Sequence, residues 1–250
     1  NPLSSKVYIN YIAASDLSQI LLQEKAKMSS YVQFGYVLDK EMIINPFNLS
    51  VSLEAGKSYQ KTGIEFNYRH SYYGRENGLD MRLFAGAMLN NNTDPQYYSL
   101  AAGGRSGREQ YLYGGTFPGR FNLFPESFWS RQMTPSEGGL VSPVNDSLGY
   151  SNWLISLSVT ANLPGRAGKL PVKPFVNLLI NDHGPATESQ SPLFFEAGLK
   201  AGIWDLFEIF VPLVVSGNIR SVNGQFKDRI RFVFRLDSFQ KSKLKTGFAI

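Results

Sequence analysis

The sequence predicts an all-β protein, namely a transmembrane antiparallel up-and-down β-barrel of about ten to twelve strands with one long extracellular segment. Three observations predict this fold. Apolar and polar residues alternate with a period of two over most of the chain, as they do in a sheet with two different faces. Connections between the alternating segments are long and short in turn, and no apolar run is long enough for a membrane helix.

Residues 60–90 show the alternation most clearly, as two segments joined by a polar turn. On the apolar side are Ile64, Phe66, Tyr68, Tyr72, Leu79, Met81, Leu83, Ala85, Ala87 and Leu89. On the polar side are Lys61, Glu65, Asn67, Arg69, Ser71, Asp80, Arg82 and Asn90. Pairing must keep like faces together, and one allowed register sets Arg69 opposite Asp80 and Asn67 opposite Arg82. We therefore predict a hairpin in that register.

Three further strands are predicted before this hairpin, at residues 6–14, 31–39 and 47–55, because each alternates in the same way. Residues 16–28 have no clear period and are assigned to a loop. After the hairpin, residues 91–149 are rich in Gly, Asn, Ser and Pro and are too long for an ordinary connection. We expect this segment to be a lid, a plug or an extra hairpin, with residues 110–114 and 127–133 as the candidate strands.

Alternation returns at Tyr150 and continues almost to the end of the chain. The expected strands are residues 150–163, 172–181, 193–203, 207–215 and 230–237. Pro212 lacks the amide that a central strand needs, so we expect a bulge or a strand end there. Long loops then fall on one rim and short turns on the other, the layout in which turns face the periplasm and loops face outside.

Composition fits a β-rich protein of 250 residues, treated as a single domain over residues 1–250. Charged residues make up only 18%, aromatic residues reach 14%, and cysteine is absent. The net charge of +5 includes a basic tail with Lys241, Lys243 and Lys245, which is typical of a solvated end, and no nucleic-acid partner is expected. Since the chain begins at Asn1 without Met or a signal peptide, it is expected to be the C-terminal part of a longer protein.

Periodicity alone does not decide which face of the sheet meets water, because a soluble barrel or sandwich also alternates. We call the alternate residues on the apolar side of each strand the apolar parity, and those on the polar side the polar parity. Two features favour lipid outside: the apolar parity is almost free of Lys and Glu, and the polar parity carries equal numbers of positive and negative residues. Balanced charges favour a filled, ion-paired lumen over a selective pore. The candidate lumen-facing ion-pair residues are Glu65, Arg69, Asp80, Arg82, Glu196, Lys200, Arg231 and Arg235.

Several short stretches resemble a known family. They are residues 44–49 (Ile-Asn-Pro-Phe-Asn-Leu), 78–86 (Gly-Leu-Asp-Met-Arg-Leu-Phe-Ala-Gly), 111–113, 119–120, 128–132 and 207–213. Together they resemble the C-terminal outer-membrane β-barrel region of large Gram-negative surface proteins, in which a thermolysin-type zinc aminopeptidase-like domain often precedes the barrel. The resemblance implies location in the outer membrane of a Gram-negative bacterium. It implies contact with outer-membrane lipid and an upstream domain or envelope protein on the periplasmic side.

No catalytic, cofactor or metal site is predicted in this chain. The peptidase of that family carries His-Glu-x-x-His, which is absent here, so peptidase activity would reside in an upstream domain. A phospholipase would need a Ser/His pair near the rim; His70 has lipid-facing parity but lies toward the periplasmic end, and His183 is interpreted as a loop residue. Residues 165–169 and 103–108 are interpreted as a basic turn and a flexible loop rather than phosphate or anion sites.

We therefore expect a membrane-embedded β-barrel domain that anchors or scaffolds a larger envelope protein. A small outer-membrane channel or transporter is one alternative, and it would need a lumen that the ion pairs do not close. A soluble ligand-binding β-barrel is the other, and it would place Leu83, Ile155, Leu157 and Phe234 inside.

Overall fold

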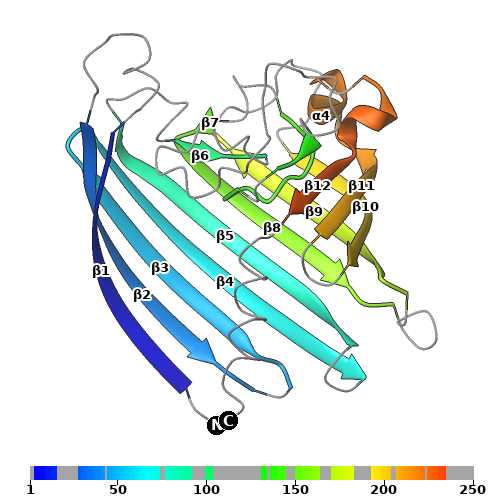
Figure 1. Ribbon diagram of the computed structural model, residues 1–250, viewed down its shortest axis with the longest axis horizontal. Coiled ribbons are helices and arrows are strands. Elements are labelled where there is room, and N and C mark those ends of the chain that lie inside the picture. Colours follow the sequence, from blue (N-terminus) through cyan, green and yellow to red (C-terminus); the bar gives the residue numbers. More distant parts are fainter. Residues whose placement is uncertain are drawn as a thin grey trace, which may run out of the picture.

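The computed structural model describes residues 3–15, 28–42, 44–73, 77–91, 99–103, 131–133, 136–144, 150–163, 170–182, 193–203, 207–222 and 224–234. Ten strands form one antiparallel sheet in which each strand pairs with its neighbour in the sequence, apart from two short strands that lie outside it. The prediction of an all-β, up-and-down antiparallel fold is therefore confirmed. Figure 1 shows the sheet as a broad, strongly twisted surface.

The strands of the large sheet are β1 (Leu3–Ser15), β2 (Met28–Lys40), β3 (Phe47–Gly56), β4 (Tyr59–Tyr73), β5 (Asn77–Asn91), β8 (Trp153–Ala161), β9 (Val172–Asn181), β10 (Phe194–Ile203), β11 (Phe207–Val215) and β12 (Arg231–Phe234). The second sheet contains only β6 (Leu100–Ala101) and β7 (Tyr150–Ser151). These bounds agree with the predicted strands to within a few residues at most ends. Residues 110–114 and 127–130, where we expected an extra hairpin, lie outside the described residues.

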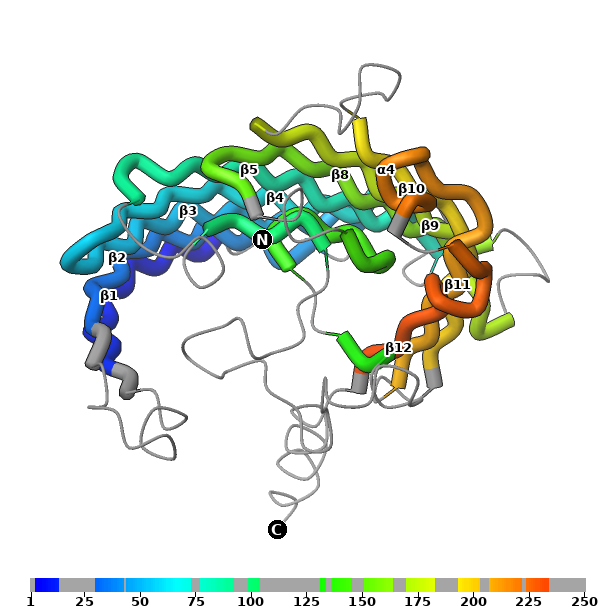
Figure 2. Tube along the Cα trace, turned by 90° about the horizontal axis from the view of Figure 1, so that it is seen from above, coloured from blue at the N-terminus to red at the C-terminus, as the bar shows by residue number. Residues whose placement is uncertain are grey.

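The sheet curves into an open arc rather than a closed barrel. Figure 2, which looks along the strands, shows β1 at one end of the arc and β12 at the other. In the described residues β1 pairs only with β2, and β12 pairs with β11 on one side, without a bond between the two edge strands. Barrel closure is thus not part of the observed fold.

The register of the central hairpin is the predicted one. Arg69 lies opposite Asp80 and Asn67 lies opposite Arg82. Because side chains alternate along each strand, this register carries Lys61, Glu65, Arg69, Asp80 and Arg82 to one face, whereas His70 lies on the other. The face with the charged residues is the concave one, since its residues bond to chain segments that lie inside the arc.

The apolar parity lies on the convex face and is exposed from β1 to β10, whereas Phe232 of β12 is buried. Its exposed members include Val7, Ile9, Tyr11, Phe34, Val51, Leu53, Ile64, Phe66, Leu83, Trp153, Ile155, Val176, Ile180 and Leu199. Leu83 is 46% exposed and Ile155 is 43% exposed, although a soluble barrel would bury both. Soluble monomers rarely expose a continuous apolar surface of this extent.

In the C-terminal third the structure departs from the predicted pattern in two ways: Val215 lies on the other face, and helices follow β11. A register shift between Ala197 and Gly198 pairs Pro212 with Gly198 and Val214 with Ala197, which confirms the expected bulge at Pro212. The bulge reverses the parity beyond it, so Val215, predicted to face outward, is 3% exposed and belongs to the inner core. Residues 216–226, expected as a loop, contain α4 (Gly217–Val222) and the start of η3 (Phe226–Arg229).

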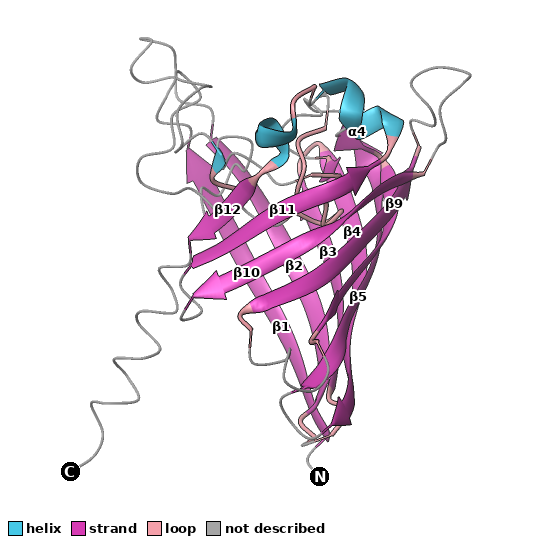
Figure 3. Cartoon of the chain, turned by 90° about the vertical axis from the view of Figure 1, so that its right-hand side faces the viewer, coloured by secondary structure: helices cyan, strands magenta, loops and turns pink. Residues whose placement is uncertain are grey.

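The two ends of the sheet differ. The helices lie at one end together with the described residues 99–103 and 136–144 of the segment between β5 and β8 (Figure 3). No helix of the described residues is long and apolar enough to cross a membrane.

Candidate functional site

The concave side of the sheet holds chain from the long segment between β5 and β8. We call residues 131–133 and 136–144 the inner segment; Figure 2 shows its pieces in green, inside the arc. Its amides at Gly138 and Leu140 donate to the carbonyl oxygens of Ala101 and Ala102, at 2.9 and 3.1 Å. The inner segment is therefore joined by backbone bonds to the chain that leads out of β5.

Apolar side chains between the inner segment and the sheet form the main buried core. Leu140 is 1% exposed and packs in a cluster with Phe84, Leu100, Ala102, Leu154, Leu179, Phe194, Val215 and Ile219. Phe84, Leu154, Leu179 and Phe194 come from the polar parity of their strands. These large apolar residues on the polar parity mark the place where the inner segment covers the sheet.

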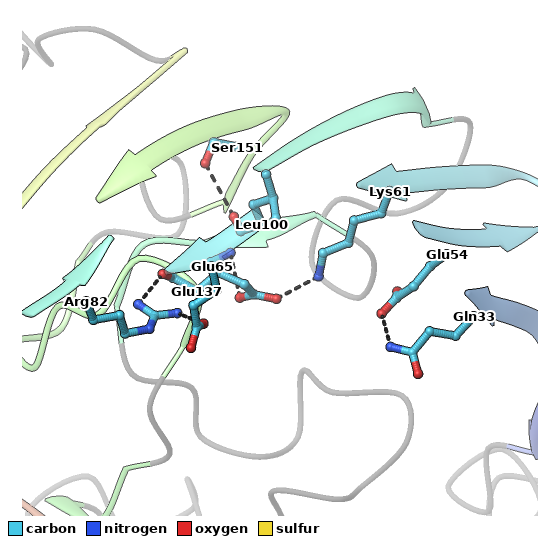
Figure 4. Close-up of polar contacts among 9 residues, drawn as sticks. Gln33, Glu54, Lys61, Glu65, Arg82, Leu100, Glu137 and Ser151 are labelled. Carbon is cyan, nitrogen blue, oxygen red and sulfur yellow. Dashed lines mark hydrogen bonds and ion pairs between the residues drawn. The ribbon is translucent and has the colours of Figure 1, made fainter. Parts of the chain in front are cut away.

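Glu137 attaches the inner segment to β4 and β5. Its carboxylate lies 2.6 Å from Lys61 Nζ and also accepts the amide of Ala101 at 3.3 Å, while its carbonyl oxygen accepts Arg82 Nη1 at 2.9 Å and Ser156 Oγ at 3.1 Å. Figure 4 shows Lys61 and Arg82 reaching Glu137 from two sides. Both cations are partly buried here, where charge-assisted bonds are stronger than at an open surface.

Glu196 attaches the same segment to β9 and β10. This carboxylate is 0% exposed and accepts the amide of Val141 at 2.5 Å, the amide of Ser142 at 3.0 Å and Asn177 Nδ2 at 2.8 Å. A buried carboxylate needs several donors to offset the loss of its hydration. Here the inner segment supplies two of them through its own backbone.

Most of the other residues predicted to face inward form ion pairs in the structure. Arg82 Nη2 lies 2.7 Å from Glu65 Oε2, and Arg69 lies 3.6 Å from Asp80. Lys200 pairs with Glu208 at 2.8 Å, so Glu196 and Lys200 have different partners.

Arg231 lies opposite Phe210 in the register of β11 and β12, and Arg235 lies outside the described residues. Lys61, predicted to be inward, is brought to the same network.

Two cavities lie on the concave side, with volumes of about 520 and 440 Å³. Both are lined by Arg82, Ser158 and Thr160, and the first is also lined by Glu137 and Leu140 of the inner segment. The inner segment thus occupies only part of the concave side, and Arg82 lies between the two open spaces.

Sequence reasoning did not single out Glu137, because it lies in a stretch without period. A signal was present in the adjacent glycines. Gly139 has φ of +71°, and a Cβ at Gly138 would stand 2.3 Å from the carbonyl oxygen of Ala102. A Glu-Gly-Gly-Leu sequence in which both glycines are required indicates a turn packed closely against other backbone.

The described residues contain no group of three or more His, Asp or Glu side chains able to hold a metal ion. His70 is exposed, and its Nδ1 lies 3.4 Å from Tyr68 Oη. His183 and the glycine-rich stretches at 103–108 and 165–169 lie outside the described residues except for Gly103. The geometry offers a network that holds chain on the concave face, and no arrangement of reacting groups was found in it.

No protein-family model matches this sequence, and the search of curated proteins found no match.

Proposed function

We propose that this chain is a membrane-embedded β-barrel domain of an outer-membrane protein, and that it anchors or scaffolds a larger envelope protein. One observation carries the proposal: the apolar parity is exposed on the convex face from β1 to β10, while the charged residues of the central hairpin face the concave side. This is the arrangement of a sheet whose outer solvent is lipid. The strands of 9 to 15 residues in the main body of the sheet also suit a span of about nine to eleven tilted residues.

Closure of the sheet between β1 and β12 belongs to the same proposal. Unpaired amides and carbonyl groups cost several kcal/mol each in hydrocarbon, so a spanning sheet has no free edge. Ten successive antiparallel strands leave β1 and β12 antiparallel to each other, which is the direction that closure requires. Location in the outer membrane of a Gram-negative bacterium, and an upstream domain on the periplasmic side, rest on the family resemblance given above.

Anchoring is favoured over conduction by the inner segment. This segment is held through its own Glu137 and through Glu196 of β10, and its Leu140 side chain is buried against the sheet. A channel would need this segment to leave the concave side. The soluble alternative is disfavoured because Leu83 and Ile155 are exposed rather than inside.

Two neighbouring residues of β3 give a matched test. Val51 is on the convex face and 39% exposed, while Ser50 is on the concave face opposite Glu65. In lipid vesicles Val51→Arg is expected to lower the free energy of unfolding by about 2–4 kcal/mol, because the charge would lie in hydrocarbon. Ser50→Arg is expected to cost much less, since the new guanidinium can pair with Glu65.

The measurement is denaturant unfolding of both variants and the parent chain in the same vesicles. A Val51→Arg variant as stable as the parent chain would place the convex face in water and would rule out the proposal.

A further inference from the structure

The inner segment also bonds to the edge of the sheet. The amide of Met133 donates to the carbonyl oxygen of Phe232 at 2.9 Å, and Gln132 forms a parallel bridge with Phe232. The N–H and C=O of a strand residue point to the same side, so the polar groups of Phe232 face away from β11. Residues 131–133 thus occupy the edge of β12 that a neighbouring strand would use.

This contact is well packed. Gln132 is 2% exposed and Phe232 is 3% exposed, although Phe232 lies opposite Ile209 on the convex parity. Met133 packs with Val141, Phe175 and Val233 in a second buried cluster. Residues 131–133 are therefore attached to β12 both by backbone contact with Phe232 and by the packing of Met133 against Val233.

The opposite edge of the sheet is uncovered. In the described residues β1 has β2 on one side and no strand on the other. Val7, Ile9 and Tyr11 are 72, 65 and 70% exposed, against 46% for Leu83 in the middle of the sheet. The excess exposure is that expected of a strand with one neighbour missing.

We propose that residues 131–133 and β1 compete for the edge of β12 that faces away from β11, so that residues 131–133 must leave Phe232 before the two edges of the sheet can pair. The inner segment then controls closure of the sheet: bonds that hold it on the concave face also keep the edges apart. This proposal rests on the proposed function, because only a sheet in lipid requires the edges to pair.

Disulfide cross-linking tests the competition directly, because the chain has no native cysteine. Phe232→Cys is combined with Gln132→Cys to detect the capped edge. It is combined with Ile9→Cys, Tyr11→Cys or Ala13→Cys in turn to detect the paired edges, since these residues share its parity. A variant with cysteines at 132, 232 and one β1 position then reports both contacts in the same sample of detergent-folded protein.

We expect the 132–232 product to predominate in the otherwise unchanged chain. Glu196→Gln loosens the inner segment, and it is expected to raise the ratio of the β1–232 product to the 132–232 product about tenfold, the effect of losing a charge-assisted buried hydrogen bond. Glu137→Gln is expected to act in the same direction. Asp80→Asn is the matched control, because Asp80 pairs with Arg69 and is not among the residues that hold the inner segment.

A second set of cysteine pairs, made from residues on the concave face, leaves Phe232 unchanged and so controls for misfolding caused by Phe232→Cys. It uses Val233→Cys with Met133→Cys for the capped edge, and Val233→Cys with Asn10→Cys or Ile12→Cys for the paired edges. A product ratio that does not change with Glu196→Gln, or the absence of any β1–β12 product in both scans, overturns the proposal. Failure of the proposed function has a different result, which is folded protein in the absence of detergent or lipid.

Discussion

Glu196 is the residue on which attachment of the inner segment depends most. It is fully buried and accepts from three residues, Val141 and Ser142 in the inner segment and Asn177 in β9. A neutral amide in its place would turn an NH₂ group toward one of those backbone amides and leave donors without an acceptor. The charge at this position is thus part of the packing between the sheet and the inner segment.

Glu196→Gln is accordingly expected to lower the free energy of unfolding by about 2–3 kcal/mol. Asp80→Asn removes a carboxylate that is 42% exposed and is expected to cost less than about 1 kcal/mol. Urea unfolding of the two variants in the same lipid vesicles measures the difference. Equal losses would contradict the structural role assigned to Glu196.

Much of the residue-level network is visible in the sequence, because ionisable residues on one parity of a strand must share a face. Glu65, Arg82 and Glu196 were predicted to be inward on that basis; Glu65 pairs with Arg82, and Glu196 binds the inner segment. Glu137 was not predicted, since its segment has no period to indicate a face. Large apolar residues such as Phe84 and Leu154 on the polar parity indicate a covered patch, but they do not identify the segment that covers it.

At the scale of elements, the inner segment depends on two adjacent glycines. Gly139 has a left-handed backbone conformation, and a Cβ there would stand 2.6 Å from Ser158 Oγ. Leu140 follows directly and fills the buried core between the inner segment and the sheet. The turn at Gly139 therefore aims Leu140 at the sheet.

Gly139→Ala is expected to lower the free energy of unfolding by about 1–2 kcal/mol, because a side chain disfavours the left-handed conformation. Gly202→Ala is the control, since a Cβ at Gly202 would meet only Glu208 Cγ, at an ordinary 3.9 Å. Limited proteolysis and denaturant unfolding of both variants check this. A Gly139→Ala variant that resists protease as well as Gly202→Ala does would contradict it.

The strands themselves are predictable because a period of two follows directly from strand geometry. The bulge was predicted from the missing amide of Pro212, but its consequence, the reversal of parity that buries Val215, follows from the register with β10 and is not in the local sequence. The six-residue helix α4 was missed because six residues are too few for a helical period to be read.

For the whole molecule, the main finding is a sheet with its apolar face outward and its charged face covered in part by its own chain. Soluble proteins bury the apolar face because burial is favourable by about 25 cal/mol per Å². This chain leaves that face uncovered, and it uses the concave face to hold the inner segment. Such a sheet is compatible with hydrocarbon around it, and this is the environment that we propose for the chain.

In the described residues the first and the last strand of the arc do not pair with each other. Each strand of the large sheet pairs with the next one along the chain, apart from the short β6 and β7, so sequence alternation is enough to predict the strand order and the face of most residues. The first and the last strand are far apart in the sequence, and the alternation of apolar and polar residues does not specify a contact between them. In the described residues the edge of β12 is occupied by Gln132 and Met133.

The most direct measurement of the central claim is refolding of the chain with and without detergent micelles, followed by electrophoresis of heated and unheated samples. We predict that the compact form appears only in detergent, as a band that shifts on heating. Monodisperse folded protein in plain buffer, with no heat-dependent shift, would contradict it and would mean that the convex apolar face is covered by something other than lipid.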